Sequence, residues 1–305
     1  MKKILAFILL ACTVFALAAC NAPAEREYSL AVVVDYTFSN SKGTNVACAV
    51  VFDKDGKIVA TRFDSIDETF ALSEGGDLLA VDSIDTKVEQ GEAYGGTEVP
   101  EYMQMPKGSW EKQAAAFEAA IVGKTAAEVE EFDAATVAGC TMQATVPMFV
   151  NAVKKAAAYD AKVSFKTAED ITLGLGVNGK ISGSVVDGAT ADIDYAAVVL
   201  AGGKVAACML ESSKNEYTLT VSDGTLTASG EYAGTKNEQG DGYSMPNGSW
   251  KKQAQVFANS VVGKTAAELE NIEVTSDALV EAGCTMQYTV GGYKAVIIEA
   301  ASKAK

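Results

Sequence analysis

The sequence predicts an α+β protein made of two tandem repeats, each a mainly antiparallel sheet packed with two or three helices. Three observations predict this class. A long segment occurs twice along the chain, each copy begins with apolar runs separated by turn residues, and each copy continues with apolar residues at helical spacing. Because the strands come first and the helices follow, an α+β arrangement is favoured over a parallel α/β sheet.

The internal repeat determines the expected domain organisation. Residues 105–128 match residues 245–268 at 16 of 24 positions, and Met105–Trp110 recurs as Met245–Trp250 with a single change. Shorter matches lie on either side: Thr86–Gly91 with Thr235–Gly240, and Ala138–Gln143 with Ala282–Gln287. We therefore expect repeat domains at residues 28–158 and 162–305, with a boundary near residues 159–161.

Each repeat begins with a predicted β-hairpin. In the first repeat, the apolar runs Val46–Phe52 and Ile58–Phe63 flank the turn residues Asp55 and Gly56. Apolar runs of this length around a glycine-containing turn are typical of antiparallel strands. The second repeat has the same pattern in Tyr195–Leu200, Gly202-Gly203 and Val205–Leu210, and further hairpins are expected around Gly75-Gly76 and Asp223-Gly224.

A helix is predicted after the hairpin in each repeat. Trp110, Ala114, Phe117 and Ile121 follow at steps of four, three and four residues, which places them on one helix face. The second repeat has Trp250, Ala254, Phe257 and Val261 at the same spacing. We expect the helices to be capped by Ser109 and Ser249 and to end at Gly123 and Gly263.

Two further helical segments are predicted in the first repeat, a short one and a longer last one. Thr125–Glu128 has the Thr-x-x-Glu pattern of a capping box, and Thr265–Glu268 repeats it in the second copy. Residues 147–158 form the last predicted helix of the first repeat, and Ala138–Thr141 leads into it.

The composition excludes several classes of function. The chain of 305 residues carries a net charge of −15, which argues against nucleic acid or an anionic membrane face as a partner. It contains no histidine, so Ser-His and Cys-His catalysis and histidine-ligated zinc or haem are excluded. No nucleophile–base set is visible in the sequence, so an enzyme with its own bond-making chemistry is the least favoured class. We expect no metal site, because Asp53–Gly56 lacks the remaining ligands of a calcium loop and indicates a turn.

The first residues have the pattern of an export signal. Lys2 and Lys3 precede the apolar run Ile4–Leu17, which is too short for a good membrane span. Leu17–Cys20 resembles the bacterial lipoprotein signal, or lipobox. The resemblance implies cleavage after residue 19 and a lipid on Cys20, with residues 20–27 as a tether. The protein would then be anchored to the membrane on its extracytoplasmic face. The alternative is an ordinary secretory signal with an incidental cysteine.

Four further cysteines remain after the signal and the lipidation site. They lie in apolar or small-residue runs at wide spacing, at Cys48, Cys140, Cys208 and Cys284. An exported chain could form disulfides, but this spacing lacks the pattern of a disulfide scaffold. We therefore expect free, buried thiols.

The segment around Thr141 resembles a flavin-attachment signature. Gly139-Cys140-Thr141, followed by a predicted helix, resembles the Ser-Gly-Ala-Thr signature of bacterial FMN-binding domains, and Asp55–Val59 is similar to a strand of that family. The resemblance implies FMN joined by a phosphoester to Thr141 and Thr285, beside Gly139 and Gly283. Lys124 and Lys264 would face the phosphate, with Lys87 and Lys236 behind them. The alternative is that Gly139 and Cys140 only allow close packing where the chain enters the helix.

A broader resemblance covers most of both repeats. The order of hairpin, Gly-Ser-Trp helix, Val-Gly-Lys-Thr and Ala-Gly-x-Thr is similar to uncharacterised lipoproteins of clostridia-type bacteria. That family has no known function to transfer to this chain.

The polar segments Thr86–Gly91 and Thr235–Gly240 are predicted to be loops. Their retained Lys, Glu and Gln residues suggest a site for an anionic group that uses free backbone N–H groups, while recent duplication is the alternative explanation. Trp110 and Trp250 could stack on a flavin or sugar ring, but their helical spacing favours core anchors.

Two functional hypotheses follow from these observations. In the first, a surface lipoprotein binds flavin in duplicated domains and transfers electrons outside the membrane. In the second, a surface lipoprotein without a cofactor binds a ligand or a protein partner.

Overall fold

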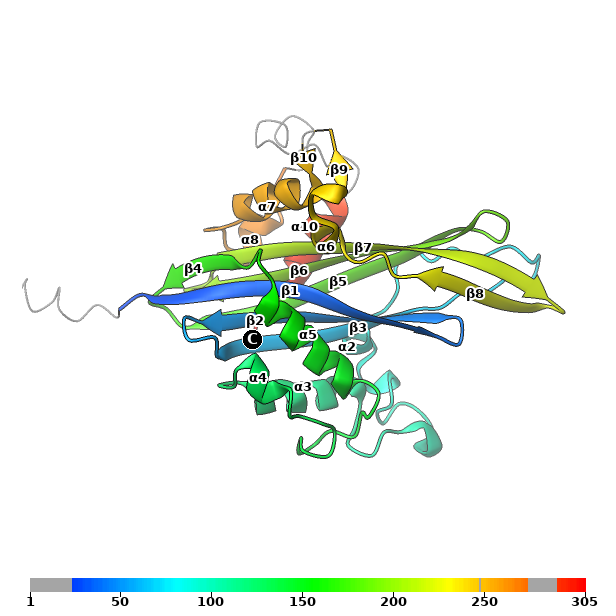
Figure 1. Cartoon of the computed structure of the whole chain (residues 1–305), viewed down its shortest axis with the longest axis horizontal. Helices are drawn as coiled ribbons and strands as arrows, with labels where there is room; N and C mark the ends of the chain where they lie inside the picture. The colour runs from blue at the N-terminus through cyan, green and yellow to red at the C-terminus, as the bar shows by residue number, and fades with distance from the viewer. Residues whose placement is uncertain (1–23, 247, 274–289) are drawn as a thin grey trace, which may run out of the picture.

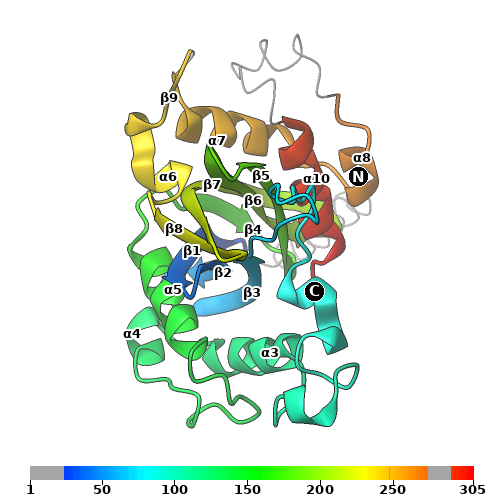
Figure 2. The same ribbon diagram turned by 90° about the vertical axis from the view of Figure 1, so that its right-hand side faces the viewer.

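The computed structural model describes residues 24–246, 248–273 and 290–305, which form four layers. Two antiparallel sheets lie face to face in the middle, and helices cover the outer side of each (Figures 1 and 2). The predicted α+β class is confirmed. Within the described ranges, no helix is long and apolar enough to cross a membrane.

The first sheet, called sheet 1, has the strand order β3-β2-β1-β4. Its strands are β1 (Arg26–Ser39), β2 (Lys42–Asp53), β3 (Ile58–Glu68) and β4 (Val163–Thr167), so the predicted β2–β3 hairpin is confirmed. Strand β1 begins two residues inside the expected tether, because Arg26 and Glu27 pair with residues of β4. Strand β4 comes from the sequence assigned to the second repeat, so sheet 1 combines residues from both halves of the chain.

The second sheet, called sheet 2, has the strand order β5-β6-β7-β8. Its strands are β5 (Ile171–Ser184), β6 (Gly188–Ala201), β7 (Lys204–Ser222) and β8 (Thr225–Glu231), and both predicted hairpins occur in it. Asp223 and Gly224 both have positive φ, as a two-residue turn between twisted strands requires. Around Gly75-Gly76 the pairing is limited to one bridge between Leu72 and Leu78.

Helices and short segments complete each half. On the sheet 1 side these are α2 (Lys87–Gln90), η1 (Gly91–Ala93), η2 (Glu101–Met103), α3 (Trp110–Ile121), α4 (Ala126–Val129) and α5 (Val146–Ala158). On the sheet 2 side they are α6 (Lys236–Gln239), η3 (Gly240–Gly242), the ribbon β9 (Ser244–Met245) and β10 (Gly248–Ser249), α7 (Trp250–Ser260), α8 (Ala266–Leu269) and α10 (Val290–Ser302).

The structure confirms most of the helix predictions. The predicted apolar faces of α3 and α7 are buried, and Trp110 and Trp250 are each 1% exposed. The capping boxes at Thr125 and Thr265 are both formed. Ser109 and Ser249 occupy the N-cap positions, but neither side chain makes the expected cap bond. The Ser109 hydroxyl donates instead to the Glu92 carboxylate, at 3.4 Å.

Three apolar layers hold the sheets and helices together. Strand residues alternate between the two faces of a sheet, so Val33 packs under α3 and α5 while Val32 points toward sheet 2. The layer between the sheets contains Ile193, Tyr195 and Met209 from sheet 2. Because this central layer draws on both halves, each half buries one face of its sheet against the other.

Two glycines in β5 let α10 approach sheet 2 closely. A Cβ atom at Gly174 would overlap the carbonyl oxygen of Ala300, and one at Gly176 would overlap that of Val296. Glycine inside a strand often marks such a close backbone approach. The equivalent positions in sheet 1 are occupied by Ala31 and Val33. These two residues pair with β2 at the same register at which Gly174 and Gly176 pair with β6.

Candidate functional site

Thr141 lies in the connection between α4 and α5. Its backbone N–H and its hydroxyl both donate to Gln113 Oε1 of α3, at 2.6 and 2.9 Å. Gly139, two residues earlier, has a positive φ of 90°. Helix α5 begins only at Val146, so Thr141 precedes its first turn. Gly283 and Thr285, the corresponding residues of the second repeat, lie outside the described residues.

Lys124 and Lys264 lie between the long helix and the short capped helix of their halves. Their backbones tie the helix to the hairpin, because the Lys124 carbonyl accepts from Ile58 N–H and the Lys264 carbonyl accepts from Val205 N–H, both at 2.8 Å. The Lys124 side chain lies near Glu128 and helps to lower the pKa of that carboxyl, after the Thr125 hydrogen bonds. Within the described ranges, no contact joins Lys124 to Thr141.

The segments expected to be polar loops are instead single helical turns, α2 and α6. Thr86 and Thr235 each form a capping box, which uses the N–H groups that an anionic ligand would need. Lys87 and Lys236 are buried, and their ammonium groups lie 5.9 Å from the Trp110 ring and 5.6 Å from the Trp250 ring. The recurring Lys and Glu residues therefore have structural partners within the protein.

Two buried carboxyl groups face these helical turns. Asp64 accepts a hydrogen bond from Val88 N–H at 3.2 Å, and Glu211 accepts one from Asn237 N–H at 3.1 Å. Burial raises the pKa of Asp64 and of Glu211 to about 7. Sequence reasoning missed both carboxyl groups. The signal that could have found them is an acid directly after each predicted strand segment, at the sixth residue after Ile58 and after Val205.

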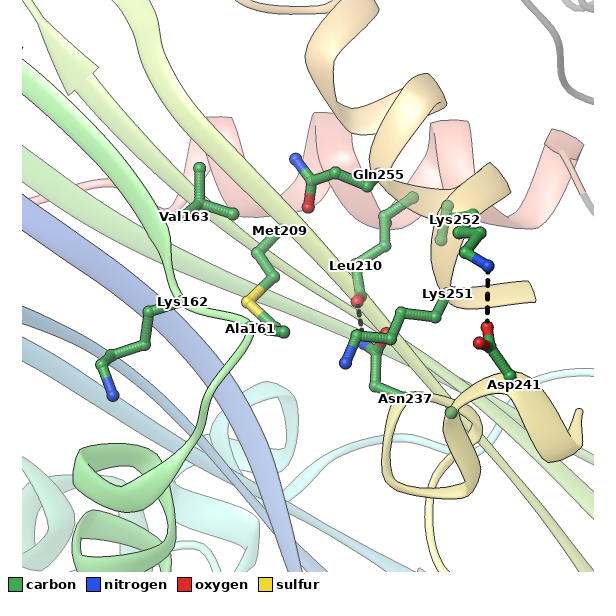
Figure 3. A pocket seen from close by; sticks show the side chains of 12 residues that line it. Ala161, Lys162, Val163, Met209, Leu210, Asn237, Asp241, Lys251, Lys252 and Gln255 are labelled. Atoms are coloured by element: carbon green, nitrogen blue, oxygen red, sulfur yellow. Dashed lines mark hydrogen bonds and ion pairs between the residues drawn. The ribbon is translucent and has the colours of Figure 1, made fainter. Parts of the chain in front are cut away.

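A cavity between helix and sheet in the second half has a volume of ≈ 570 Å³ and is called the α7 cavity. It lies where α7, β7, the α6 segment and the start of β4 meet (Figure 3). Its apolar lining comes from Ala161, Val163, Met209, Leu210 and Ala254. Its polar lining comes from Lys162, Asn237, Gly240, Asp241, Lys251, Lys252 and Gln255.

Most polar groups of the α7 cavity have partners in the protein. The Lys162 ammonium donates to the carbonyls of Ala157 and Tyr159, at 2.8 and 2.6 Å. Lys252 pairs with Asp241 at 3.1 Å, and Asn237 donates to the Leu210 carbonyl at 2.8 Å (Figure 3). Lys251 contacts the face of the Tyr159 ring, with its ammonium 5.8 Å from the ring centroid.

The first half has a cavity at the corresponding place. Ile58 and Val205 occupy equivalent positions, because each N–H donates to the carbonyl of the lysine that follows the long helix. Counting five residues on from each, Phe63 of the first half corresponds to Leu210 of the second. The lining of this cavity includes Phe63, Val88 and Ala114. The equivalent residues Leu210, Asn237 and Ala254 line the α7 cavity. The volume of the first-half cavity is smaller, ≈ 310 Å³, and residues 302–305 lie against it.

A polar cluster lies between the two sheets, away from both cavities. Glu68 Oε1 accepts from Asn45 Nδ2 and from Asn215 Nδ2, each at 2.7 Å, and Glu68 Oε2 accepts from the Tyr217 hydroxyl. Tyr36 shares a hydrogen bond of 2.7 Å with Tyr217. Burial raises the pKa of Glu68 to about 7.

The described cysteines are free and buried, as predicted for Cys48, Cys140 and Cys208, and Cys284 lies outside the described residues. Burial raises the pKa of Cys208 to about 12, so this thiol stays protonated at neutral pH. In the part of the chain that the structure describes, no group of three or more Cys, Asp or Glu side chains could hold a metal ion.

Comparison with protein-family models, with curated proteins and with solved structures gave no match for this chain.

Proposed function

We propose that this chain is a lipid-anchored, extracytoplasmic binding lipoprotein whose ligand site is the α7 cavity. The membrane anchor in this proposal is the lipid on Cys20, and no nucleic acid is a partner. The single observation that supports a ligand site is the cavity itself. It combines an apolar wall with a few polar groups, and its volume of ≈ 570 Å³ is within the usual range of small-molecule sites.

The two corresponding cavities differ in a way that favours the one beside α7. The first-half cavity is about half as large, and charged pairs fill its edge. Arg62 pairs with Glu118 at 3.1 Å, and Lys303 pairs with Glu299. The α7 cavity has one such pair in its lining, Lys252 with Asp241, and residues 161–163 form part of its wall. We therefore assign binding to the α7 cavity and not to the cavity of the first half.

The flavin hypothesis depends on the sequence resemblance around Thr141. The Thr141 hydroxyl donates to Gln113 and is four residues from the N-cap of α5. A phosphoester would remove the hydroxyl proton that makes this bond. The function that we propose is therefore that of a cofactor-free binding lipoprotein.

Two fluorescent dyes test the binding site. Anilinonaphthalene sulfonate and phenylnaphthylamine share the same ring system, and both fluoresce more strongly in an apolar site. We expect saturable binding of at least one dye to the mature protein. Gln255→Trp should abolish it by obstructing the cavity, while Val262→Trp, at an exposed residue outside the lining, should not. Equal binding by wild type and Gln255→Trp would show that the cavity is not the site.

A further inference from the structure

We propose that the α7 cavity takes an organic anion with an apolar body, and that Lys251 is the cation that recognises its charged group. This inference rests on the proposed function, because it names the class of ligand for the same site. It is carried by the charges on the cavity lining, by the partners of each lining lysine, and by the corresponding residue in the first half.

The lining of the α7 cavity is basic, although the protein is strongly acidic. Three lysines and one carboxylate line it, while the whole chain has a net charge of −15. The wall formed by Val163, Met209 and Leu210 is apolar and suits a hydrocarbon or aromatic body. A ligand complementary to both features has a negative group at one end and an apolar part at the other.

The three lining lysines differ in how their charges are used. Lys251 acts on a carboxylate only at a distance, because the pKa of Asp241 is lowered mainly by hydrogen bonds to Ser249 and Lys252 and to a smaller extent by the Lys251 charge. Lys162 is used by two backbone carbonyls at the end of α5, and Lys252 is paired with Asp241. Lys251 is half-buried and contacts the Tyr159 ring, and no carboxylate or carbonyl within the described ranges lies at hydrogen-bond distance from its ammonium. Figure 3 shows its side chain extending from α7 among the residues that line the cavity.

Lys251 lies at the positive end of the α7 dipole, and the lining carboxylate on which its charge acts, Asp241, is already paired with Lys252. Lys251 is in the first turn of α7, which has no acidic residue, and Lys252 follows it. The N-terminal end of a helix is the positive end of its dipole, so cations there are disfavoured. In the first half, α3 has Glu111 at the same position, the residue that the dipole favours. An anionic ligand beside Lys251 would supply the negative charge that Glu111 supplies in α3.

The same dyes test this inference, because they differ only in the sulfonate group. We expect wild-type protein to bind anilinonaphthalene sulfonate about tenfold or more tightly than phenylnaphthylamine, as a charge-assisted contact of moderate strength provides. Lys251→Gln should remove this preference, and Lys251→Arg should keep most of it. Lys264→Gln, a lysine outside the cavity lining, is the matched control and should leave the preference unchanged.

The outcomes separate this inference from the proposed function. If Gln255→Trp abolishes binding of both dyes but Lys251→Gln leaves their ratio unchanged, the cavity is the site and the anion inference is wrong. A preference lost equally in Lys264→Gln would also overturn it, since the effect would then be one of overall charge. If Gln255→Trp reduces the binding of neither dye, the proposed function and the inference both fail.

Discussion

Asn215 of strand β7 donates a hydrogen bond of 2.7 Å to Glu68 of strand β3, which joins sheet 2 to sheet 1 through a buried carboxyl group. Asn45 donates to the same carboxylate oxygen from sheet 1, and Tyr217 donates to the other oxygen from sheet 2. All three donors and Glu68 are buried. This cluster is the polar part of an otherwise apolar interface, so its protonation state should affect how firmly the two sheets pack.

The folded protein should become less stable as the pH rises from about 4.5 to about 7. Burial raises the pKa of Glu68 to about 7, with Asp67 adding to the shift, whereas the unfolded chain has an ordinary glutamate. Between these two pKa values the folded state holds a proton that the unfolded state has lost, so the free energy of unfolding falls with increasing pH. Urea unfolding at several pH values measures this slope.

Glu68→Gln isolates the contribution of this group to that slope. The variant cannot titrate, so its free energy of unfolding should vary less with pH than that of wild type. Asp64 and Glu211 still titrate near the same pH, and the remaining slope should come from them and from overall charge repulsion. Identical slopes for wild type and Glu68→Gln would contradict the assignment.

Trp110 and Trp250 should both be essential to the stability of their halves. Each is almost fully buried beside a long helix and a sheet, so replacement by Ala should cost roughly 3–5 kcal/mol of unfolding free energy. The two differ in one respect that allows a matched comparison. Trp250 Nε1 donates to the Tyr293 hydroxyl at 2.9 Å, while Trp110 Nε1 has no hydrogen-bond partner among the described residues.

Replacement by Phe should therefore cost more at Trp250 than at Trp110. We expect a difference of about 1 kcal/mol, the net value of a typical hydrogen bond. Equal costs at the two positions would mean that the Trp250–Tyr293 bond adds nothing to stability.

Gly176→Ala should destabilise the second half, because the added methyl group would overlap the Val296 carbonyl oxygen. The expected cost is about 1–3 kcal/mol, as for overpacked cores. The control is Gly203→Ala, at a hairpin turn with open space around a Cβ atom and a φ of 76°, where any cost arises from backbone strain alone. A Gly176→Ala protein as stable as wild type in thermal unfolding would mean that α10 can move away from the sheet without cost.

Cys20→Ala should release the protein from the membrane or leave an unprocessed precursor. The reason is that the lipobox cysteine is the predicted attachment site for the lipid, and several acyl chains are needed for firm anchoring. Membrane fractionation and the intact mass of the mature protein measure the outcome. Unchanged fractionation and mass in the variant would rule out lipidation at this residue.

Co-expression with a flavin transferase tests the flavin hypothesis. Since the Thr141 hydroxyl is bonded to Gln113, we expect the peptide bearing Thr141 to carry no mass of FMN. Gln113→Ala is the informative companion variant, because it frees the hydroxyl. An FMN-sized addition on the wild-type Thr141 or Thr285 peptide, lost in the Thr→Ala variants, would favour an electron carrier over a cofactor-free lipoprotein.

Local patterns made the helices and hairpins predictable. These patterns depend on residues within a few positions of one another. Examples are the spacing of Trp110 and Phe117, the Thr-x-x-Glu caps and the turn at Asp223-Gly224. Their geometry follows from helix periodicity and backbone preference, which neighbouring residues determine. The prediction of a polar loop at Thr86–Gly91 is wrong, because Thr86 and Glu89 form a capping box that starts a helical turn.

The sequence by itself determined that this is an acidic, histidine-free α+β protein in which a long segment of sequence occurs twice. Only the tertiary structure decided that the two sheets pack face to face, that β4 joins sheet 1, and that Lys251 shares a cavity with Met209 and residues 161–163. These arrangements bring together segments far apart along the chain. They depend on which apolar faces bury each other, and that choice is made by packing across the whole molecule, which no local spacing encodes.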